Sequence, residues 1–260
     1  MITMIRDKVI VVTGATSGIG VLIARRLAAK GAIPVFCGRS EQRLAAAAAS
    51  ISGRCGSRRL DVTDNEAVQA VMDSVLREFG RIDVLINNAG FGLFKTFADS
   101  TVQEFESMMD TNYMGLVRCT KAVLPSMLDN RSGHIINIAS LAGKLATPKS
   151  SGYSASKHAV VGLTDALRQE VRGRGIFVSA VNPGPIDTPF FDQADPDGSY
   201  VKNVSWLMLK PEKVADRIVH LVEKPRAELD LPWLAAAGAR LYRLFPRLAD
   251  RIAGPMLNKK

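Results

Sequence analysis

The chain begins with an arrangement that few folds accommodate: a strand, a glycine-rich turn and a helix in direct succession. An apolar run rich in β-branched side chains covers residues 8–13, and apolar residues recur at helical spacing from Leu22 to Ala28. Glycine allows a tight turn and close backbone approach, and a helix N-terminus offers free N–H groups to phosphates. The segment predicts a dinucleotide-binding turn, with a plain turn as the alternative. Its spacing is G-x-x-x-G-x-G rather than G-x-G-x-x-G, and the expected contacts are Gly14, Thr16, Ser17, Gly18, Ile19 and Gly20.

Strand and helix patterns alternate along the rest of the chain, which predicts a parallel sheet covered by helices on both faces. The later strands are expected at residues 33–37, 58–62, 82–86, 134–139, 176–181 and 229–233, and the later helices at 41–51, 65–79, 102–128, 153–172 and 211–223. The fold class is therefore α/β, a single doubly wound Rossmann-like sheet of about seven strands with a helical C-terminal extension. We expect a dinucleotide-binding catalytic domain over 1–230 and a basic amphipathic extension over 231–260.

The composition fits one soluble domain of this kind. The chain has 260 residues, of which 47% are hydrophobic, and no apolar run is long enough to span a membrane. Cys37, Cys55 and Cys119 are odd in number and lack C-x-x-C spacing, so we expect reduced thiols in a cytoplasmic protein. The three histidines are scattered, and no metal site is predicted.

Basic residues are concentrated at the C-terminus. The net charge is +9, and residues 231–260 contribute +5 of it, from six basic residues and Asp250. The remaining +4 gives little reason to expect a nucleic-acid partner.

A tyrosine and a lysine lie four residues apart at Tyr153 and Lys157, and Ser140 lies 13 residues before the tyrosine. On a helix, positions i and i+4 share a face, so an ammonium group would lie beside a phenol. A neighbouring positive charge lowers the pKa of a phenol and makes it a usable acid or base. Taken alone, the pair is more often a surface pair on a helix.

Four features together resemble the short-chain dehydrogenase/reductase family: residues 13–20, the run Asn87–Gly90, Ser140, and the Tyr153/Lys157 pair. The resemblance covers about residues 7–225. It implies a seven-stranded Rossmann sheet, hydride transfer between a nicotinamide cofactor and a carbonyl or alcohol, and a homodimer or homotetramer. It also implies that Ser140 binds the substrate oxygen, that Tyr153 is the general acid or base, and that Lys157 lowers the Tyr153 pKa and binds the ribose. Asn112 would hold a water for proton relay, with an amide at a helix kink as the alternative.

The same resemblance implies further contacts to the cofactor. They fall at or just after the ends of the third, fourth and sixth strands, at Asp61, Val62, Asn88, Ala89, Gly90, Pro183, Gly184, Ile186 and Thr188.

The end of the second strand bears on the choice of cofactor. An acidic residue there would bind the ribose 2′-hydroxyl of NAD(H), but this chain has Gly38 followed by Arg39. A guanidinium complements a 2′-phosphate in charge and geometry, so we expect NADP(H) rather than NAD(H). The alternative is that Arg39 is a solvated loop residue.

Apolar residues near the predicted site suggest an apolar ketone or a 3-oxoacyl-type substrate. The segment from Pro189 to Leu209 lies where the family has a mobile lid. Core packing explains part of this pattern equally well. The expected substrate contacts are Ser140, Leu141, Leu145, Tyr153, Phe190 and Phe191.

Two other functions are compatible with this fold. One is a cofactor-sensing binding protein without activity, which would not need Ser140, Tyr153, Lys157 and Asn112 together. The other is a sugar-nucleotide epimerase or dehydratase, which shares the Tyr/Lys pair but usually has a larger C-terminal substrate part.

The tail from Leu231 to Lys260 combines basic and apolar stripes at the same helical spacing. Pro246 is expected to split it into two short helices. We favour a role as a cover for the domain or a partner subunit, with contact to an anionic membrane as the sharper alternative. The stripes are Arg240, Arg243, Arg247 and Arg251, and Leu241, Leu244, Leu248 and Ile252.

Overall fold

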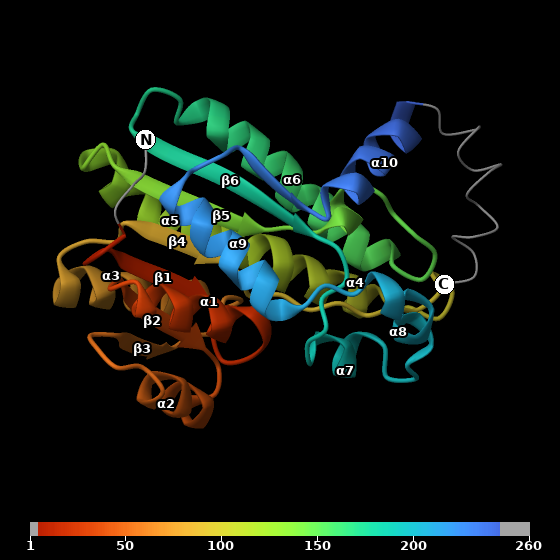
Figure 1. Cartoon of the computed structure of the whole chain (residues 1–260), viewed down its shortest axis with the longest axis horizontal. Coiled ribbons are helices and arrows are strands. Elements are labelled where there is room, and N and C mark those ends of the chain that lie inside the picture. The colour runs from red at the N-terminus through yellow and green to blue at the C-terminus, as the bar shows by residue number, and fades with distance from the viewer. Residues whose placement is uncertain (1–4, 245–260) are drawn as a thin grey trace.

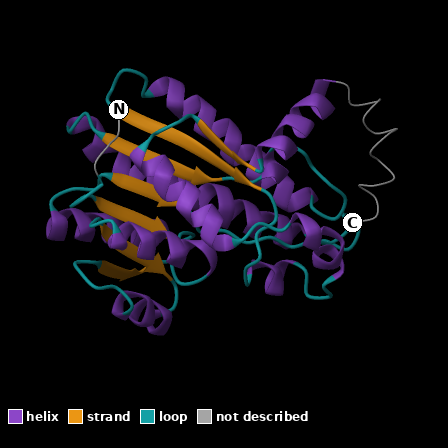
Figure 2. Cartoon of the chain, viewed as in Figure 1, coloured by secondary structure: helices purple, strands orange, loops and turns teal. Residues whose placement is uncertain are grey.

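The computed structural model describes residues 5–244, and in this part of the chain it contains one seven-stranded sheet (Figure 2). The strand order is β3-β2-β1-β4-β5-β6-β7, and all neighbouring strands are parallel. The predicted α/β class and parallel sheet are therefore confirmed. The strands are β1 (Val9–Thr13), β2 (Ile33–Gly38), β3 (Gly56–Arg59), β4 (Val84–Asn87), β5 (Gly133–Ile138), β6 (Ile176–Pro183) and β7 (Glu228–Leu231).

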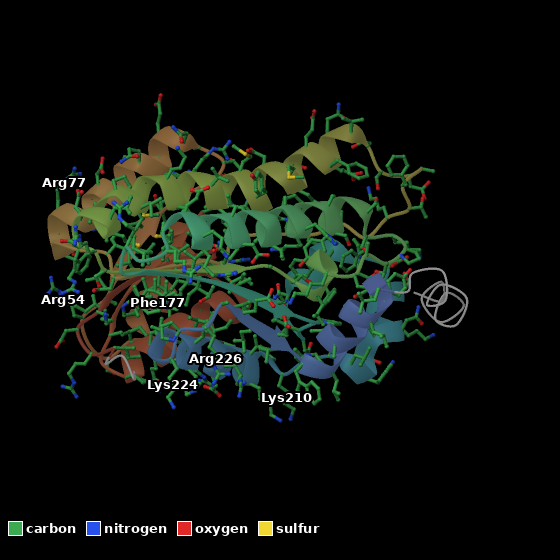
Figure 3. The ribbon with its side chains drawn as sticks, turned by 90° about the horizontal axis from the view of Figure 1, so that it is seen from above. Arg54, Arg77, Phe177, Lys210, Lys224 and Arg226 are labelled. Atoms are coloured by element: carbon green, nitrogen blue, oxygen red, sulfur yellow. The ribbon has the colours of Figure 1, made fainter. Side chains whose placement is uncertain are left out.

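Helices cover both faces of the sheet (Figures 1 and 3). One apolar core joins the sheet to α1 (Gly18–Ala29), α2 (Glu41–Ala49) and α9 (Pro211–Glu223). A second core joins the other face to α3 (Asn65–Phe79), α5 (Gly115–Asp129) and α6 (Ser151–Glu170). Every residue of β1 is buried, which explains why the first strand is a continuous apolar run rather than an alternating one.

Local sequence signals set several helix ends. The Asp64 side chain caps α3 by accepting a hydrogen bond from the Ala67 N–H at 3.0 Å, as the sequence predicts. Gly80 ends α3 in the left-handed conformation at φ 76°, where a side chain would be strained. Pro211 opens α9, where its missing N–H removes no helical hydrogen bond.

The long helical stretch predicted over 102–128 is present but interrupted. It consists of α4 (Val102–Met109), a five-residue π-helical segment at Asp110–Met114, and α5. A π-turn inserts one extra residue into a helix and is often found at functional sites. The segment contains Asn112.

Two predicted strands are misplaced. The third runs over Gly56–Arg59 rather than 58–62, because the chain turns at Asp61, whose carboxylate accepts hydrogen bonds from the Thr63 N–H and hydroxyl. The seventh ends at Leu231 rather than at 233, because Pro232 has no N–H to continue the ladder. Trp233 instead begins α10 (Trp233–Leu244).

The lid segment is helical, with α7 (Phe190–Ala194), α8 (Ser199–Val204) and a 3-10 turn at Ser205–Leu207. The second half of the predicted tail, including Pro246, lies outside the described residues. None of the described helices is both long and apolar enough to cross a membrane.

Candidate active site

A cavity of about 880 Å³ follows the carboxyl edge of the sheet. In parallel α/β sheets, ligands bind at this edge, where strand order reverses. Here the reversal lies between β1 and β4, which both flank the cavity through the residues that follow them. Of the site residues predicted from sequence, all line the cavity except Gly20 and Asn112, which lie directly behind it.

The glycine-rich turn depends on the absence of side chains at two positions. A Cβ on Gly14, at φ +64°, would lie 2.9 Å from the Ala89 Cα, and a Cβ on Gly20 would lie 2.4 Å from the Gly14 carbonyl oxygen. Gly20 therefore packs the helix against the turn instead of facing the cavity. Ser17 is the N-cap of α1, so the unpaired N–H groups of the first helical turn begin at the cavity wall.

The Thr13 hydroxyl ties the turn to the end of β4, a role that the sequence did not suggest. It accepts hydrogen bonds from the N–H groups of Asn88 and Ala89, both at 3.0 Å. The Asn88 side chain donates back to the carbonyl oxygens of Thr13 and Gly14, at 2.9 and 3.2 Å. These bonds fix the two strand ends that meet at the reversal.

At the end of β2, Gly38 packs against Thr16. A Cβ on Gly38 would lie 2.6 Å from the Thr16 Cγ2, so an acidic side chain does not fit there while Thr16 is present. Arg39 follows, is exposed and lines the cavity.

Asp61 and Val62 lie across from Arg39 in the same part of the cavity. Burial would raise the pKa of the Asp61 carboxyl. The two hydrogen bonds from Thr63 and the charge of Arg39 outweigh burial and lower the pKa.

Ser140, Tyr153 and Lys157 meet at the other end of the cavity. Ser140 follows β5, and its hydroxyl donates to the Pro183 carbonyl at 3.3 Å and accepts from the Ala142 N–H at 3.1 Å. The Lys157 Nζ donates to the Ile138 carbonyl at 2.8 Å and lies 5.7 Å from the centre of the Tyr153 ring.

Burial dominates the protonation of this pair. It raises the pKa of Tyr153 to about 12, only partly offset by a hydrogen bond with Ser140, and it lowers the pKa of Lys157 from 10.5 to about 8. The Tyr153 pKa is therefore raised rather than lowered in this structure, because burial outweighs the hydrogen bond with Ser140. The expected lowering by Lys157 stays a prediction. The phenol is fully protonated at neutral pH.

Asn112 is buried behind Lys157 and uses its whole side chain within the protein. Its Oδ1 accepts from the Phe91 N–H at 2.9 Å, and its Nδ2 donates to the Phe91 carbonyl at 2.8 Å and the Ser156 hydroxyl at 2.9 Å. A Cβ on Gly90 would lie 2.9 Å from the Asn112 Oδ1 and 3.5 Å from the Lys157 Nζ, so both groups border Gly90. The Asn112 amide thus joins the π-turn to the β4 end and to α6.

The residues after β6 close the middle of the cavity. Pro183, Gly184, Ile186 and Thr188 all line it, and a Cβ on Gly18 would be in ordinary contact with the Thr188 side chain at 3.7 Å. The glycine-rich turn and the β6 end therefore face each other.

Aromatic side chains surround the end of the cavity that contains Tyr153. The Phe94 ring lies 5.8 Å from the Tyr153 ring, 6.4 Å from Phe190 and 4.5 Å from Tyr200, measured between ring centres. Phe191 packs beneath them and is largely buried. Leu141 and Leu145 line the cavity as predicted. Sequence reasoning missed Tyr200, because a single tyrosine in a lid segment has no spacing that sets it apart.

A buried ionic cluster next to Ser140 was also missed. The Lys144 Nζ lies 2.6 Å from the Asp230 carboxylate and 3.1 Å from the Glu228 carboxylate, both on β7. Asp230 also accepts from the Asn182 amide at 2.8 Å. The cluster fixes the loop after Ser140 to the strand that leads into α10.

No group of His, Cys, Asp or Glu side chains within residues 5–244 is arranged to hold a metal ion. Cys37 and Cys119 are buried free thiols whose pKa values burial raises.

A family model described as short chain dehydrogenase matches residues 8–198. The chain is 40% identical over 225 residues to an uncharacterized oxidoreductase of Staphylococcus saprophyticus, covering 85% of this chain and 93% of that one. It is 41% identical over 238 residues to dehydrogenase/reductase SDR family member 7B of Xenopus tropicalis, covering 86% and 77% of the two chains.

Two solved structures are similar in fold. One is the closed form of a serine dehydrogenase complexed with NADP+, with a TM-score of 0.81 and 32% identity over 85% of this chain and 93% of the other. The second is a short-chain dehydrogenase from Streptomyces avermitilis, with a TM-score of 0.83 and 30% identity over 96% and 97%.

We predict that Lys144→Met lowers the free energy of unfolding by about 2 kcal/mol, because it removes the buried ammonium group that pairs with the partly buried carboxylates of Glu228 and Asp230. Lys144→Met combined with Asp230→Asn should lose less than the sum of the two single variants. Urea unfolding of the four proteins measures this coupling. Additive losses would show that the cluster does not act as an ion pair.

Stability should also rise between pH 8 and about 9 because of Lys157. Its pKa is about 8 in the folded chain and 10.5 when exposed, so in this window the unfolded chain binds a proton that the folded chain lacks. The free energy of unfolding then increases by up to about 1.4 kcal/mol per pH unit. Above about pH 9 the raised pKa values of Cys37, Cys119 and then Tyr153 act in the opposite direction, because the unfolded chain loses protons that the folded chain keeps, so the comparison stops there. Lys157→Met should have a flatter profile in chemical unfolding; parallel profiles would contradict the assignment.

Proposed function

The chain belongs to the short-chain dehydrogenase family, and from this premise we propose that it is an NADP(H)-dependent oxidoreductase that reduces an apolar ketone or a 3-oxoacyl-type substrate. The observation that carries the proposal is the arrangement of one cavity. The cavity is lined by Ser140, Tyr153 and Lys157 beside β5 and, on the other side of β4, by the glycine-rich turn after β1 and Arg39 after β2.

The residues present fit a nicotinamide dinucleotide. The turn has no side chains where a pyrophosphate must approach the backbone, and the N-terminus of α1 offers N–H groups and the positive end of the helix dipole. Asp61, Val62, Asn88, Ala89 and Gly90 would border the adenosine half. Pro183, Gly184, Ile186 and Thr188 would border the nicotinamide half. When bound, the cofactor supplies or accepts the hydride.

The proton belongs to Tyr153 in this proposal. The Ser140 hydroxyl donates a hydrogen bond to the substrate oxygen and holds it beside the phenol. Tyr153 is protonated at neutral pH and donates its proton to the oxygen as the carbonyl is reduced, and in the reverse direction the phenolate accepts it. When protonated, Lys157 places a positive charge near the phenol, which would stabilise the phenolate. Lys157 would also bind the ribose hydroxyls.

Asn112 acts by positioning in this scheme. Because its side chain is fully engaged with Phe91 and Ser156, a relay water would bind to the main-chain carbonyls of the π-turn rather than to the amide.

Two features support NADP(H) over NAD(H). Residue 38 is glycine and packs against Thr16, so the carboxylate that would bind a 2′-hydroxyl and repel a phosphate is absent. Arg39 is exposed beside the same part of the cavity, where a guanidinium can bind a 2′-phosphate.

The aromatic surroundings of Tyr153 support an apolar substrate. Phe94, Phe190 and Tyr200 offer ring faces and edges, and Leu141 and Leu145 add aliphatic surface. The free thiols of Cys37 and Cys119 support a reducing cytoplasmic location. By family membership we also propose a homodimer or homotetramer.

Tyr153→Phe should abolish turnover while NADPH binding remains within a few-fold of wild type. The ring keeps its contacts with Phe94 and Phe190 but has no proton to donate, and loss of one acid–base group costs about a hundredfold or more in rate. NADPH oxidation is followed against a panel of aldehydes, ketones and 3-oxoacyl compounds, and cofactor binding by fluorescence. Wild-type turnover of the variant on any accepted substrate would refute the assignment.

Arg39→Leu should lower kcat/KM for NADPH by about ten- to a hundredfold, which corresponds to loss of about 1.5–3 kcal/mol of charge-assisted binding, and leave NADH nearly unchanged. Arg77→Leu is the control, because Arg77 is also exposed but does not line the cavity.

Introducing an acid to favour NADH requires Gly38→Asp together with Thr16→Ala, since Thr16 occupies the space. A wild-type preference for NADH would overturn the cofactor proposal.

A further inference from the structure

Helix α10 has two faces with different surroundings. Its inner face is packed on the domain, with Ala236 and Ala239 buried, and Ala235 and Ala239 also line the cavity. Its outer face is apolar and lies in water. The large side chains on it, each 61–72% exposed, are Trp233, Leu234, Leu241 and Leu244.

These four residues form one stripe. At 100° per residue they fall within an arc of about 100° on the helix, opposite the buried alanines. Elsewhere in the described chain, large exposed apolar residues are scattered, and Trp206 in the 3-10 turn of the lid is the most prominent near the cavity. A contiguous apolar stripe of this kind marks an interaction surface.

The stripe lies at the substrate end of the molecule. In Figure 1, α10 stands at the same end as the lid helices α7 and α8, away from the β3 edge. Figure 3 shows α10 at this end in the perpendicular view, beside the point where the described chain stops. Leu207 of the lid and Ala235 of α10 border the same cavity.

Charge decides what can cover the stripe. Residues 231–260 carry six basic side chains and one acid, a net charge of +5 in a chain of +9. A second copy carries the same net positive charge in its residues 231–260, and repulsion between like charges opposes a symmetric pairing through α10. An anionic lipid surface instead neutralises the basic residues and accepts leucine and tryptophan side chains at the level of its headgroups.

We propose that this protein docks on anionic lipid surfaces through the outer face of α10, with Trp233, Leu234, Leu241 and Leu244 inserted between headgroups. Docking brings the aromatic end of the cavity close to the lipid, where apolar substrates dissolve. The helix lies flat, because its opposite face is occupied by the domain.

The test uses the full chain and co-sedimentation with vesicles of phosphatidylcholine alone or mixed with phosphatidylglycerol. Wild-type protein should bind the mixed vesicles, bind neutral vesicles at least about tenfold less, and bind less as salt is raised. The Ser variant, which combines Trp233→Ser, Leu234→Ser, Leu241→Ser and Leu244→Ser, should lose at least about tenfold in binding. The control replaces Phe97 and Phe177, which are similarly exposed but lie outside α10, and should bind like wild type.

Two further measurements keep the outcome clear. In a Trp206→Phe background Trp233 is the single tryptophan, and its emission should shift to shorter wavelength with anionic vesicles. A second variant, which combines Arg240→Gln, Arg243→Gln, Arg247→Gln and Arg251→Gln, should lose the preference for anionic vesicles.

Equal binding of the Ser variant and wild type, equal binding to neutral vesicles, or no binding by wild type would overturn the proposal. So would a change in subunit number of the Ser variant, measured by light scattering without lipid, since it would show that a second copy covers the stripe. Lipid binding is measured without turnover, so failure here leaves the proposed reaction untouched.

Discussion

The common direction of the strands is the constraint on which the site depends. Since all seven strands are parallel, the loops that follow β1, β2, β4, β5 and β6 meet at one edge, although they are far apart in sequence. The Thr13 hydroxyl then fixes the central pair of strand ends, where the order reverses. Burial of β1 on both faces makes this centre rigid, so the glycine-rich part of the cavity rests on the most protected part of the core.

Burial also sets the protonation of Tyr153 and Lys157, and it does so at a cost in stability. Loss of hydration favours the neutral form of a phenol and of an amine. It therefore raises the pKa of Tyr153 and lowers the pKa of Lys157. The Ile138 carbonyl compensates part of the loss at Lys157, and the Ser140 hydroxyl part of that at Tyr153. Both pKa values therefore depend on what occupies the cavity, since a bound ligand changes the surroundings of the two groups.

Sequence predicted the fold and most of the cavity because those signals are local. The glycine spacing, the Tyr153/Lys157 pair and the Asp64 cap each lie within one turn or one element. Sequence did not predict what depends on distant partners: Lys144 meets residues 84 and 86 positions away, and Thr16 meets Gly38 across two strands. The effect of burial on the Tyr153 pKa was missed for the same reason, because the apolar neighbours come from several segments.

The two halves of the cavity are held by different means, and this bears on specificity. The cofactor half is built from strand ends and backbone contacts that leave no room for side chains at Gly14 and Gly20. The other half is built from side chains of the lid and α10. The lid contacts the Phe94 ring through Tyr200, and the Lys144–Asp230 ion pair joins the loop after Ser140 to the strand before α10. Substitutions in this second half can change the shape of the substrate pocket without disturbing the dinucleotide turn.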